Sequence, residues 1–210
     1  SQSLNSLKKL LRKDNFDLLP FSNEGQTYNT LIYDFSSQHI KPKFGARARH
    51  FNYLEVNDML YYEVPTPLSE IYYKSVFEQG QNLDAFFTMN TFRKFNFSIA
   101  YKGLRSLGKY QHILTSTGNF RFTTNYQSKN DRYMLKAHYV AQDLLNEENG
   151  GLTDQALSNF IGNDSQFDDR SILSVNFEDA ESILDGQRIY INQKYDLIKQ
   201  IDSISNNRIE

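Results

Sequence analysis

Hydrophobic and polar residues alternate strictly over several stretches in the middle of the chain. Because successive side chains of a β-strand point to opposite faces of the sheet, each such stretch predicts a strand with one apolar face and one polar face. The clearest stretches are residues 82–90, 94–102, 119–126 and 132–139.

Residues 94–102 show the pattern most clearly. We expect one face of this strand to be apolar and the other to be polar. The apolar side chains are Phe95, Phe97, Ile99 and Tyr101, and those that alternate with them include Asn96, Ser98 and Lys102.

Other segments carry weaker strand patterns. Residues 26–35, 59–64 and 68–73 are interpreted as strands, whereas residues 42–58 are ambiguous because apolar positions lie among many charges. The dipeptide Asp185-Gly186 is typical of a tight hairpin turn, and alternation follows it. We expect residues 1–25 to be an N-terminal tail or short helix and residues 26–210 to contain the strands.

The connections between the expected strands alternate between short and long. The segment around residues 128–131 is short, whereas residues 103–118 and about 142–171 form longer polar connections. Outer-membrane barrels have short turns on one side and long loops on the other, and a soluble β-sandwich has no reason to follow this rule. The sequence therefore predicts an all-β protein, an antiparallel transmembrane β-barrel with a long external loop at about 142–171.

Composition and charge narrow the class further. The chain has 14 Tyr and 16 Phe but no Trp and no Cys, and its formal charge is −2. Absence of cysteine excludes a disulfide scaffold, a thiolate zinc site and a cysteine nucleophile. A nearly neutral balance argues against a general nucleic-acid binder. Strands with one apolar and one polar face explain how so aromatic a chain has a mean hydropathy of −0.62.

The polar positions of the predicted strands form the candidate functional site. In a membrane barrel the apolar faces point to lipid and the polar faces line the lumen. The residues expected to line the lumen are Lys94, Asn96, Ser98, Lys102, Asn119, Arg121, Thr123, Asn125, Lys136, His138, Arg188 and Lys194.

The sequence shows no recognisable catalytic or cofactor-binding motif. The histidines are not paired at ligand spacing, and neither a phosphate-binding glycine loop nor a nucleophile elbow is present. We therefore expect no catalytic residues, no metal and no cofactor. The acidic long loop leaves calcium as an alternative to simple solvation; its acidic residues are Asp143, Glu147, Glu148, Asp154, Asp164, Asp168 and Asp169.

Long stretches of the chain resemble the Bacteroidetes putative porin family. The stretches are YEVP at 62–65, FNFSIAYKGLRSLGKY at 95–110, LTSTGNFRFTTNY at 114–126, AQDLLNEENGGLTD at 141–154 and FDDRSILSVNFEDAES at 167–182. The resemblance implies an antiparallel barrel in the bacterial outer membrane and no catalytic residues. Members of the family are longer than 210 residues, so the chain is expected to hold the first part of a larger barrel.

These observations predict a porin-like barrel that allows small hydrophilic solutes to pass passively. The alternatives are a non-conducting structural or interaction subunit of a larger outer-membrane assembly, such as a secretion or gliding complex, and a soluble β-rich binding module. The expected partners are outer-membrane lipid and, in the first alternative, other outer-membrane proteins; nucleic acid is not among them.

Overall fold

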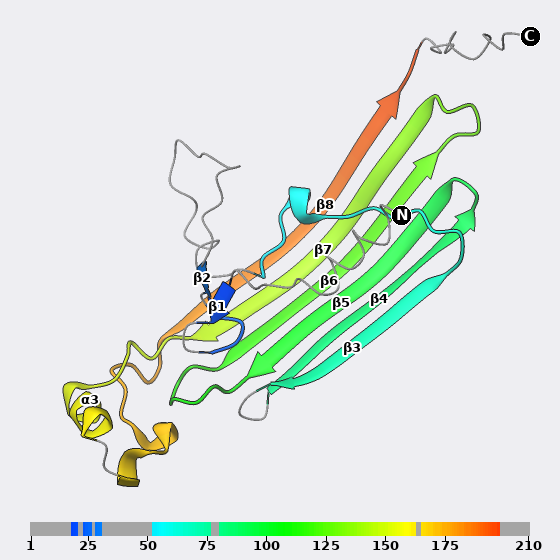
Figure 1. Cartoon of the computed structure of the whole chain (residues 1–210). Helices are drawn as coiled ribbons and strands as arrows, with labels where there is room; N and C mark the ends of the chain where they lie inside the picture. Colours follow the sequence, from blue (N-terminus) through cyan, green and yellow to red (C-terminus); the bar gives the residue numbers. More distant parts are fainter. Residues whose placement is uncertain are drawn as a thin grey trace, which may run out of the picture.

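A computed structural model describes residues 18–20, 23–26, 28–30, 52–76, 80–162 and 165–197. Their main feature is one six-stranded antiparallel sheet in which neighbouring strands follow the order of the chain (Figure 1). The predicted all-β antiparallel class is confirmed. The strands are β3 (Leu68–Val76), β4 (Gly80–Phe92), β5 (Phe95–Ser106), β6 (Thr115–Gln127), β7 (Tyr133–Glu147) and β8 (Glu181–Tyr195).

Smaller elements accompany the sheet. β1 (Leu18–Pro20) pairs with β2 (Tyr28–Thr30), and the 3-10 helix η1 (Val56–Asp58) precedes β3. The helix α3 (Asp154–Ile161) and the 3-10 helices η2 (Ser165–Phe167) and η3 (Arg170–Ile172) lie between β7 and β8. No helix among the described residues has the length and apolar character needed to cross a membrane.

From β4 to β8 the connections alternate between short and long, as expected. β3 and β4 are an exception, because only three residues join them at the end of the sheet where the long connections lie. The turn at Arg93–Lys94 and the turn at residues 128–132 lie at one end of the sheet, called the turn end below. The longer connections at residues 107–114 and 148–180 lie at the opposite end, called the loop end (Figure 1). Amide contacts join these two connections: Asn149 Nδ2 donates to the Gln111 carbonyl at 3.0 Å, and Gln111 Nε2 donates to the Ser171 carbonyl at 2.7 Å.

Several strands are longer than the sequence indicated. Half of the expected polar connection at 103–118 is strand, because β5 continues to Ser106 and β6 begins at Thr115. Gly103 and Gly118, the first and last residues of that expected connection, are opposite each other in the β5–β6 ladder. The expected loop at 142–171 likewise begins only after Glu147, the last residue of β7, and extends to residue 180.

The prediction of a hairpin at Asp185-Gly186 is wrong. Both residues lie inside β8, where Asp185 pairs with Asp143 and Gly186 with Gln142. Glycine is needed here for packing and not for a turn, because a Cβ at Gly186 would lie 2.9 Å from the hydroxyl of Tyr53. A glycine inside a strand often marks such a close approach.

The strand expected at 59–64 is also wrong. These residues form no strand; they cross one face of the sheet and contact it through individual side chains. Of the strand expected at 26–35, Tyr28–Thr30 is strand β2, and the remainder falls largely outside the described residues. Of the N-terminal tail or short helix expected at residues 1–25, only residues 18–20 and 23–25 are described, and residues 18–20 form strand β1.

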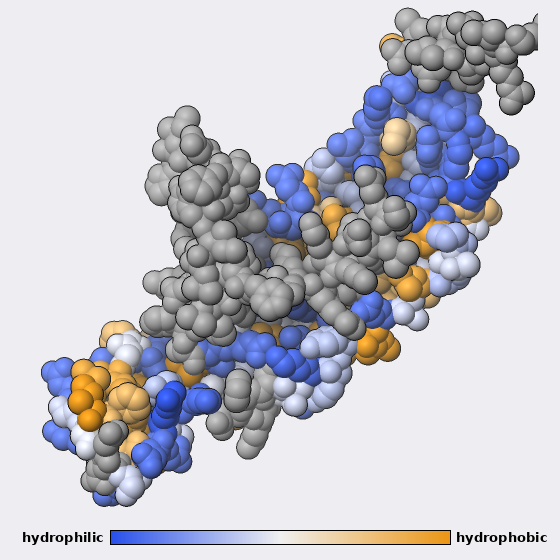
Figure 2. Space-filling view, viewed as in Figure 1, coloured by the Kyte–Doolittle hydropathy of each residue, from blue (hydrophilic) through white to orange (hydrophobic). Residues whose placement is uncertain are grey.

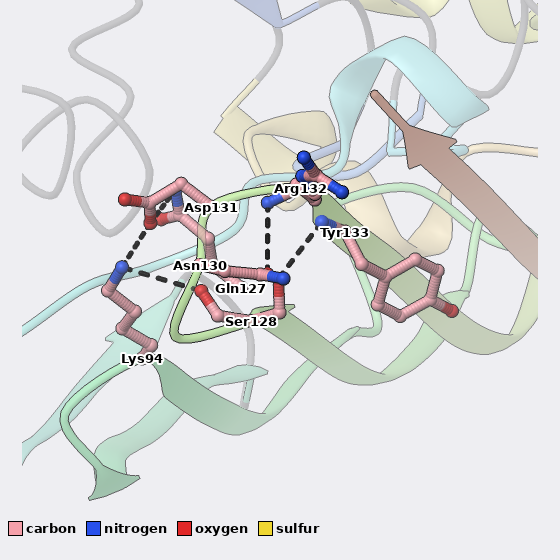
Figure 3. A network of polar contacts seen from close by, with 7 residues as sticks. All are labelled: Lys94, Gln127, Ser128, Asn130, Asp131, Arg132 and Tyr133. Atoms are coloured by element: carbon pink, nitrogen blue, oxygen red, sulfur yellow. Dashed lines mark hydrogen bonds and ion pairs between the residues drawn. The ribbon is translucent and has the colours of Figure 1, made fainter. Parts of the chain in front are cut away.

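Polar contacts fix the turn end of the sheet (Figure 3). The Ser128 hydroxyl accepts a hydrogen bond from the Tyr133 amide at 3.0 Å and donates one to Asn130 Oδ1 at 2.7 Å. Lys94 reaches from the neighbouring turn to form an ion pair with the Asp131 carboxylate. Asp131 has a left-handed backbone conformation with φ 60°. The two short turns are therefore held together as one unit.

Candidate functional site

The sheet exposes an apolar outer face. Ile71 is 77% exposed and Ile189 is 75% exposed, and the ladder places Phe87, Ile99 and other large apolar side chains on the same face. A monomeric soluble protein rarely exposes a continuous apolar surface of this kind. The other exposed large apolar residues of this face are Tyr73, Tyr101, Phe120, Tyr126, Ile183, Ile191 and Tyr195.

The inner face is polar and buried. Thr88 is fully buried, and Ser98 and His138 are each 2% exposed. This distribution is the reverse of a soluble β-sandwich, whose apolar faces meet inside. The remaining buried polar residues of this face are Asp84, Asn96, Ser106, Thr115, Thr117, Asn119, Arg121, Thr123, Gln142 and Asn146.

The strand register brings most of the predicted site residues onto this inner face. Ser98, Thr123 and His138 form one cross-strand row over β5, β6 and β7, and Lys102 lies opposite Asn119 in the next part of the sheet. The other predicted residues with the same orientation are Asn96, Asn125, Lys136, Arg121, Arg188 and Lys194. Lys94 differs, because it lies in a turn and binds Asp131.

The inner face carries a buried ion pair. Nη2 of Arg121 on β6 lies 3.6 Å from Oδ1 of Asp84 on β4, and both side chains are almost fully buried. Pairing offsets part of the cost of removing two charges from water. Polar contacts continue at Ser98, whose hydroxyl lies 2.5 Å from the hydroxyl of Thr123.

Residues 52–64, called the inner segment below, lie against this polar face. Their backbone is held first by Gln142 on β7, which accepts from the Leu54 amide at 2.9 Å and donates to the Leu54 carbonyl at 3.1 Å. Arg188 on β8 also donates to that carbonyl, at 3.1 Å. The backbone of Leu54 is thus hydrogen-bonded to two neighbouring strands, β7 and β8.

A second contact joins Tyr61 to His138. The Tyr61 hydroxyl lies 2.9 Å from Nδ1 of His138, and Arg188 Nε donates to His138 Nε2 at 3.3 Å. Since arginine can only donate, Nε2 is the accepting nitrogen, and a neutral His138 then donates from Nδ1 to the tyrosine oxygen. The ring of His138 also stacks on Tyr190, with centroids 5.0 Å apart.

The third contact is apolar. The rings of Tyr62 and Phe86 are tilted with centroids 4.7 Å apart, and these two side chains form a small buried cluster with Ala100. Burial raises the pKa of the Tyr62 hydroxyl well above its usual range, because the anion would lose solvation. Beyond this cluster, the Val64 amide donates to Asn90 Oδ1 at 3.4 Å.

A short turn at residues 23–26, called the N-terminal turn below, binds the loop end of the same face. Asn23 Nδ2 donates to the carbonyls of Ser106 and Ile113 at 3.0 and 2.8 Å. Gln26 Nε2 donates to the carbonyls of Ile113 and Glu147 at 3.1 and 3.0 Å. Gly25 allows this close approach, because a Cβ there would lie 2.4 Å from Leu104 and its φ is +90°.

The sequence did not identify Gln142 as a site residue, because β7 was expected to end before it. No local signal marked it, because Val140 and Leu144 share the face of His138 and Gln142 but are apolar, so the alternation is lost after Tyr139. The contacts of Tyr61 and Tyr62 also carried no signal, since residues far apart in the chain had to be brought together.

The loop-end connection at 148–180 combines a polar surface with exposed apolar residues. Apolar surface is visible on the lobe around α3 (Figure 2), where Leu157, Phe160 and Ile161 are exposed. Asp169 accepts two hydrogen bonds from Ser171, and these lower the pKa of its carboxyl group. Among the described residues no three acidic or histidine side chains gather in an arrangement that could hold a metal ion; Asp164 lies outside them.

The family comparison agrees with a sheet that exposes its apolar face and buries its polar face. The model of the family described as "Putative porin" matches residues 3–210, which is nearly the whole chain. No curated protein and no solved structure matches the chain. Because the match extends over all the strands of the sheet and over the segments that lie on its polar face, the chain belongs to the putative porin family.

Proposed function

We propose that the chain forms part of an outer-membrane β-barrel through which small hydrophilic solutes pass passively, without catalysis. The observation that carries the proposal is the distribution of side chains over the sheet: Ile71 and Ile189 are exposed on the apolar face, whereas Ser98 and His138 are buried on the polar face. In water the apolar face would cost about 25 cal/mol for each Å² exposed. In a bilayer that face contacts hydrocarbon instead.

The height of the apolar face supports its proposed location in the hydrocarbon region of a bilayer. Along β7 the outer face is apolar or aromatic from Tyr133 to Ala141, a rise of about 27 Å along the strand and about 20 Å for a strand tilted by about 40°. Lipid-facing bands of outer-membrane barrels are about 25 Å tall. Asp143 and Asp185, which pair across β7 and β8, mark the end of the band toward the loops.

Tyrosines mark the opposite limit of the band. Tyr126 and Tyr133 have ring centroids 6.2 Å apart, and Tyr133 pairs with Tyr195 on β8. All three lie on the outer face near the turn end. Tyrosine favours the membrane–water boundary, where its ring is dry and its hydroxyl is hydrated.

The inner face has the properties of a hydrated wall. Buried oxygens of Asn82, Asn119 and Asn125 have no hydrogen-bond partner among the described residues. In a dry core each such atom would cost about 1–3 kcal/mol, so we expect ordered water beside the polar face to satisfy it. We therefore propose that the predicted set lines the lumen, apart from Lys94 in its turn. On this face Lys102, Arg121, Lys136, Arg188 and Lys194 outnumber Asp84 and Glu70, and this balance favours anions over cations.

Closure of the barrel requires strands beyond those described. Within the described residues β3 and β8 each pair on one side only. Hydrocarbon offers no hydrogen bonds to a free strand edge, so a membrane sheet has to close on itself. The six strands are thus proposed to be an open part of a larger barrel.

Single-channel recording of the full-length protein in planar bilayers tests the proposal. We expect stable current steps and a reversal potential that indicates preference for anions. Protein that inserts into the membrane without conducting would favour the structural-subunit alternative. Recovery as a dispersed monomer without detergent would contradict the barrel itself.

A further inference from the structure

The inner segment crosses the polar face from β8 to β4. Leu54 is held by Arg188 on β8 and Gln142 on β7. Tyr61 then reaches His138 on β7, Tyr62 packs against Phe86 on β4, and Val64 binds Asn90 on β4. This segment, with η1, lies in front of the strands in Figure 1. It therefore spans most of the width of the proposed lumen wall.

We propose that the inner segment is a plug: it restricts the lumen while bound to the wall, and its release opens a wider path. The inference rests on the proposed function, since only a conducting barrel can be restricted in this way. The wall residues that hold the plug are Gln142, Arg188 and His138, with Phe86 as an apolar seat.

The height at which the plug binds makes it an obstacle. His138 and Arg188 lie on the inner face opposite the apolar band, since their strand neighbours Tyr139 and Ile189 pair with each other on the outer face. The plug is therefore bound at the depth of the bilayer and not on a rim. Any solute that moves along the polar face has to pass the backbone of Leu54 and the ring of Tyr61.

The plug is bound in a way that permits release. The inner segment is held by side-chain hydrogen bonds, by ring contacts of Tyr61 and Tyr62 and by the burial of Met59 and Val64. Residues 52–64 nevertheless form no strand with the wall. Pro65 and Pro67 follow the plug directly and have no amide hydrogen to add to a ladder. The plug can thus leave the wall without breaking any of the six strands of the sheet.

The N-terminal turn provides a second attachment for the same part of the chain. Asn23 and Gln26 bind carbonyls at the loop end, including those of Ile113 and Glu147. The chain is therefore fixed to the inner face both before and after residues 31–51. A displaced plug stays tethered and can return to the wall.

The first test removes the side-chain hydrogen bonds to the Leu54 backbone in the full-length protein. Gln142→Ala combined with Arg188→Ala deletes three of the hydrogen bonds that hold this residue. We expect single-channel conductance to rise severalfold or to switch to a larger state. The matched control is Gln187→Ala, because Gln187 lies beside Arg188 but on the outer face; it should leave conductance unchanged.

The second test separates release of the plug from widening of the wall by the two shorter side chains. The chain has no cysteine, so Tyr62→Cys with Phe86→Cys can be joined by a reducible bifunctional thiol reagent. In the Gln142→Ala/Arg188→Ala background we expect the cross-link to restore the low conductance, and reduction to raise it again. Restoration would not occur if the wider wall alone caused the increase.

Each outcome decides one claim. Equal conductance of the released variant and the native protein would overturn the plug, and so would failure of the cysteine pair to cross-link in the native background. Efficient cross-linking with no conductance in any variant would instead overturn the proposed passage of solutes, while the position of the segment on the wall would stand.

Discussion

Adjacent residues on β8 share a backbone environment but face opposite ways. Ile191 is 58% exposed on the outer face, whereas Asn192 lies opposite Lys136 on the inner face. Local strand propensity acts on both positions similarly, so a difference between them reports the environment of each face.

Arginine at Ile191 should therefore destabilise the protein more than arginine at Asn192. We expect Ile191→Arg to cost about 2–4 kcal/mol because it places a charge in the lipid-facing band, and Asn192→Arg to cost little. The free energy of unfolding from lipid vesicles in urea measures both. An equal loss, or a larger one at Asn192, would mean that the faces are assigned wrongly.

Ser98 shows why the position for an arginine substitution on the inner face has to be chosen from the structure and not from the sequence. The sequence predicts an open lumen position at Ser98, but the structure places its buried hydroxyl against Thr123. A large side chain there would meet neighbours as well as solvent. Asn192 is exposed and avoids this complication.

At the scale of elements, the turn at residues 128–132 depends on one backbone conformation. Asp131 has φ 60°, a region that asparagine tolerates and β-branched residues avoid. We expect Asp131→Ile to destabilise the folded protein by about 1–2 kcal/mol more than Asp131→Asn. Urea unfolding measures the difference, and equal stability of the two variants would exclude backbone strain as the cause.

The contribution of Lys94 is expected to be smaller than that of the backbone. Its ion pair with Asp131 is partly exposed, with 58% of the Asp131 side chain accessible, and exposed pairs contribute about 0–1 kcal/mol. The Asp131→Asn variant loses this pair but keeps the backbone preference. It therefore serves as the reference for Asp131→Ile.

The sequence predicted the strands of the middle of the sheet because their alternation is a local property. It failed at Asp185-Gly186, where the same two residues suit a hairpin turn and also the packing of Tyr53 against β8. It failed again at residues 59–64, whose aromatic residues bind His138 and Phe86 as separate side chains. Local patterns do not distinguish a residue that turns the chain from one that makes room for a distant side chain.

The candidate site was predicted in part for the same reason. Asn96, Ser98 and Thr123 follow from alternation alone, and the strand register brings them together. Gln142 was missed because the limit of β7 was placed too early. The hydrogen bonds between Gln142 and Leu54 could not be predicted from the sequence, because the two residues are 88 positions apart.

At the scale of the whole molecule, the two ends of the sheet should lie on opposite sides of the membrane. Long loops of outer-membrane barrels face outward and short turns face the periplasm. We expect a cysteine introduced by Gln155→Cys on α3 to react with a membrane-impermeant maleimide on intact cells. A cysteine introduced by Lys129→Cys at the turn end should react only after the envelope is broken. The opposite result would invert the topology.

The central claim is that the apolar face of the sheet contacts lipid while the polar face lines a hydrated interior. Spin labels attached to single cysteines at positions 189–192 of β8 test it most directly, because the chain has no other cysteine. In lipid vesicles we expect labels at Ile189 and Ile191 to be relaxed mainly by oxygen, which dissolves in the bilayer. Labels at Tyr190 and Asn192 should be relaxed mainly by a water-soluble nickel reagent. Uniform accessibility along the strand, or the reverse alternation, would contradict the membrane barrel.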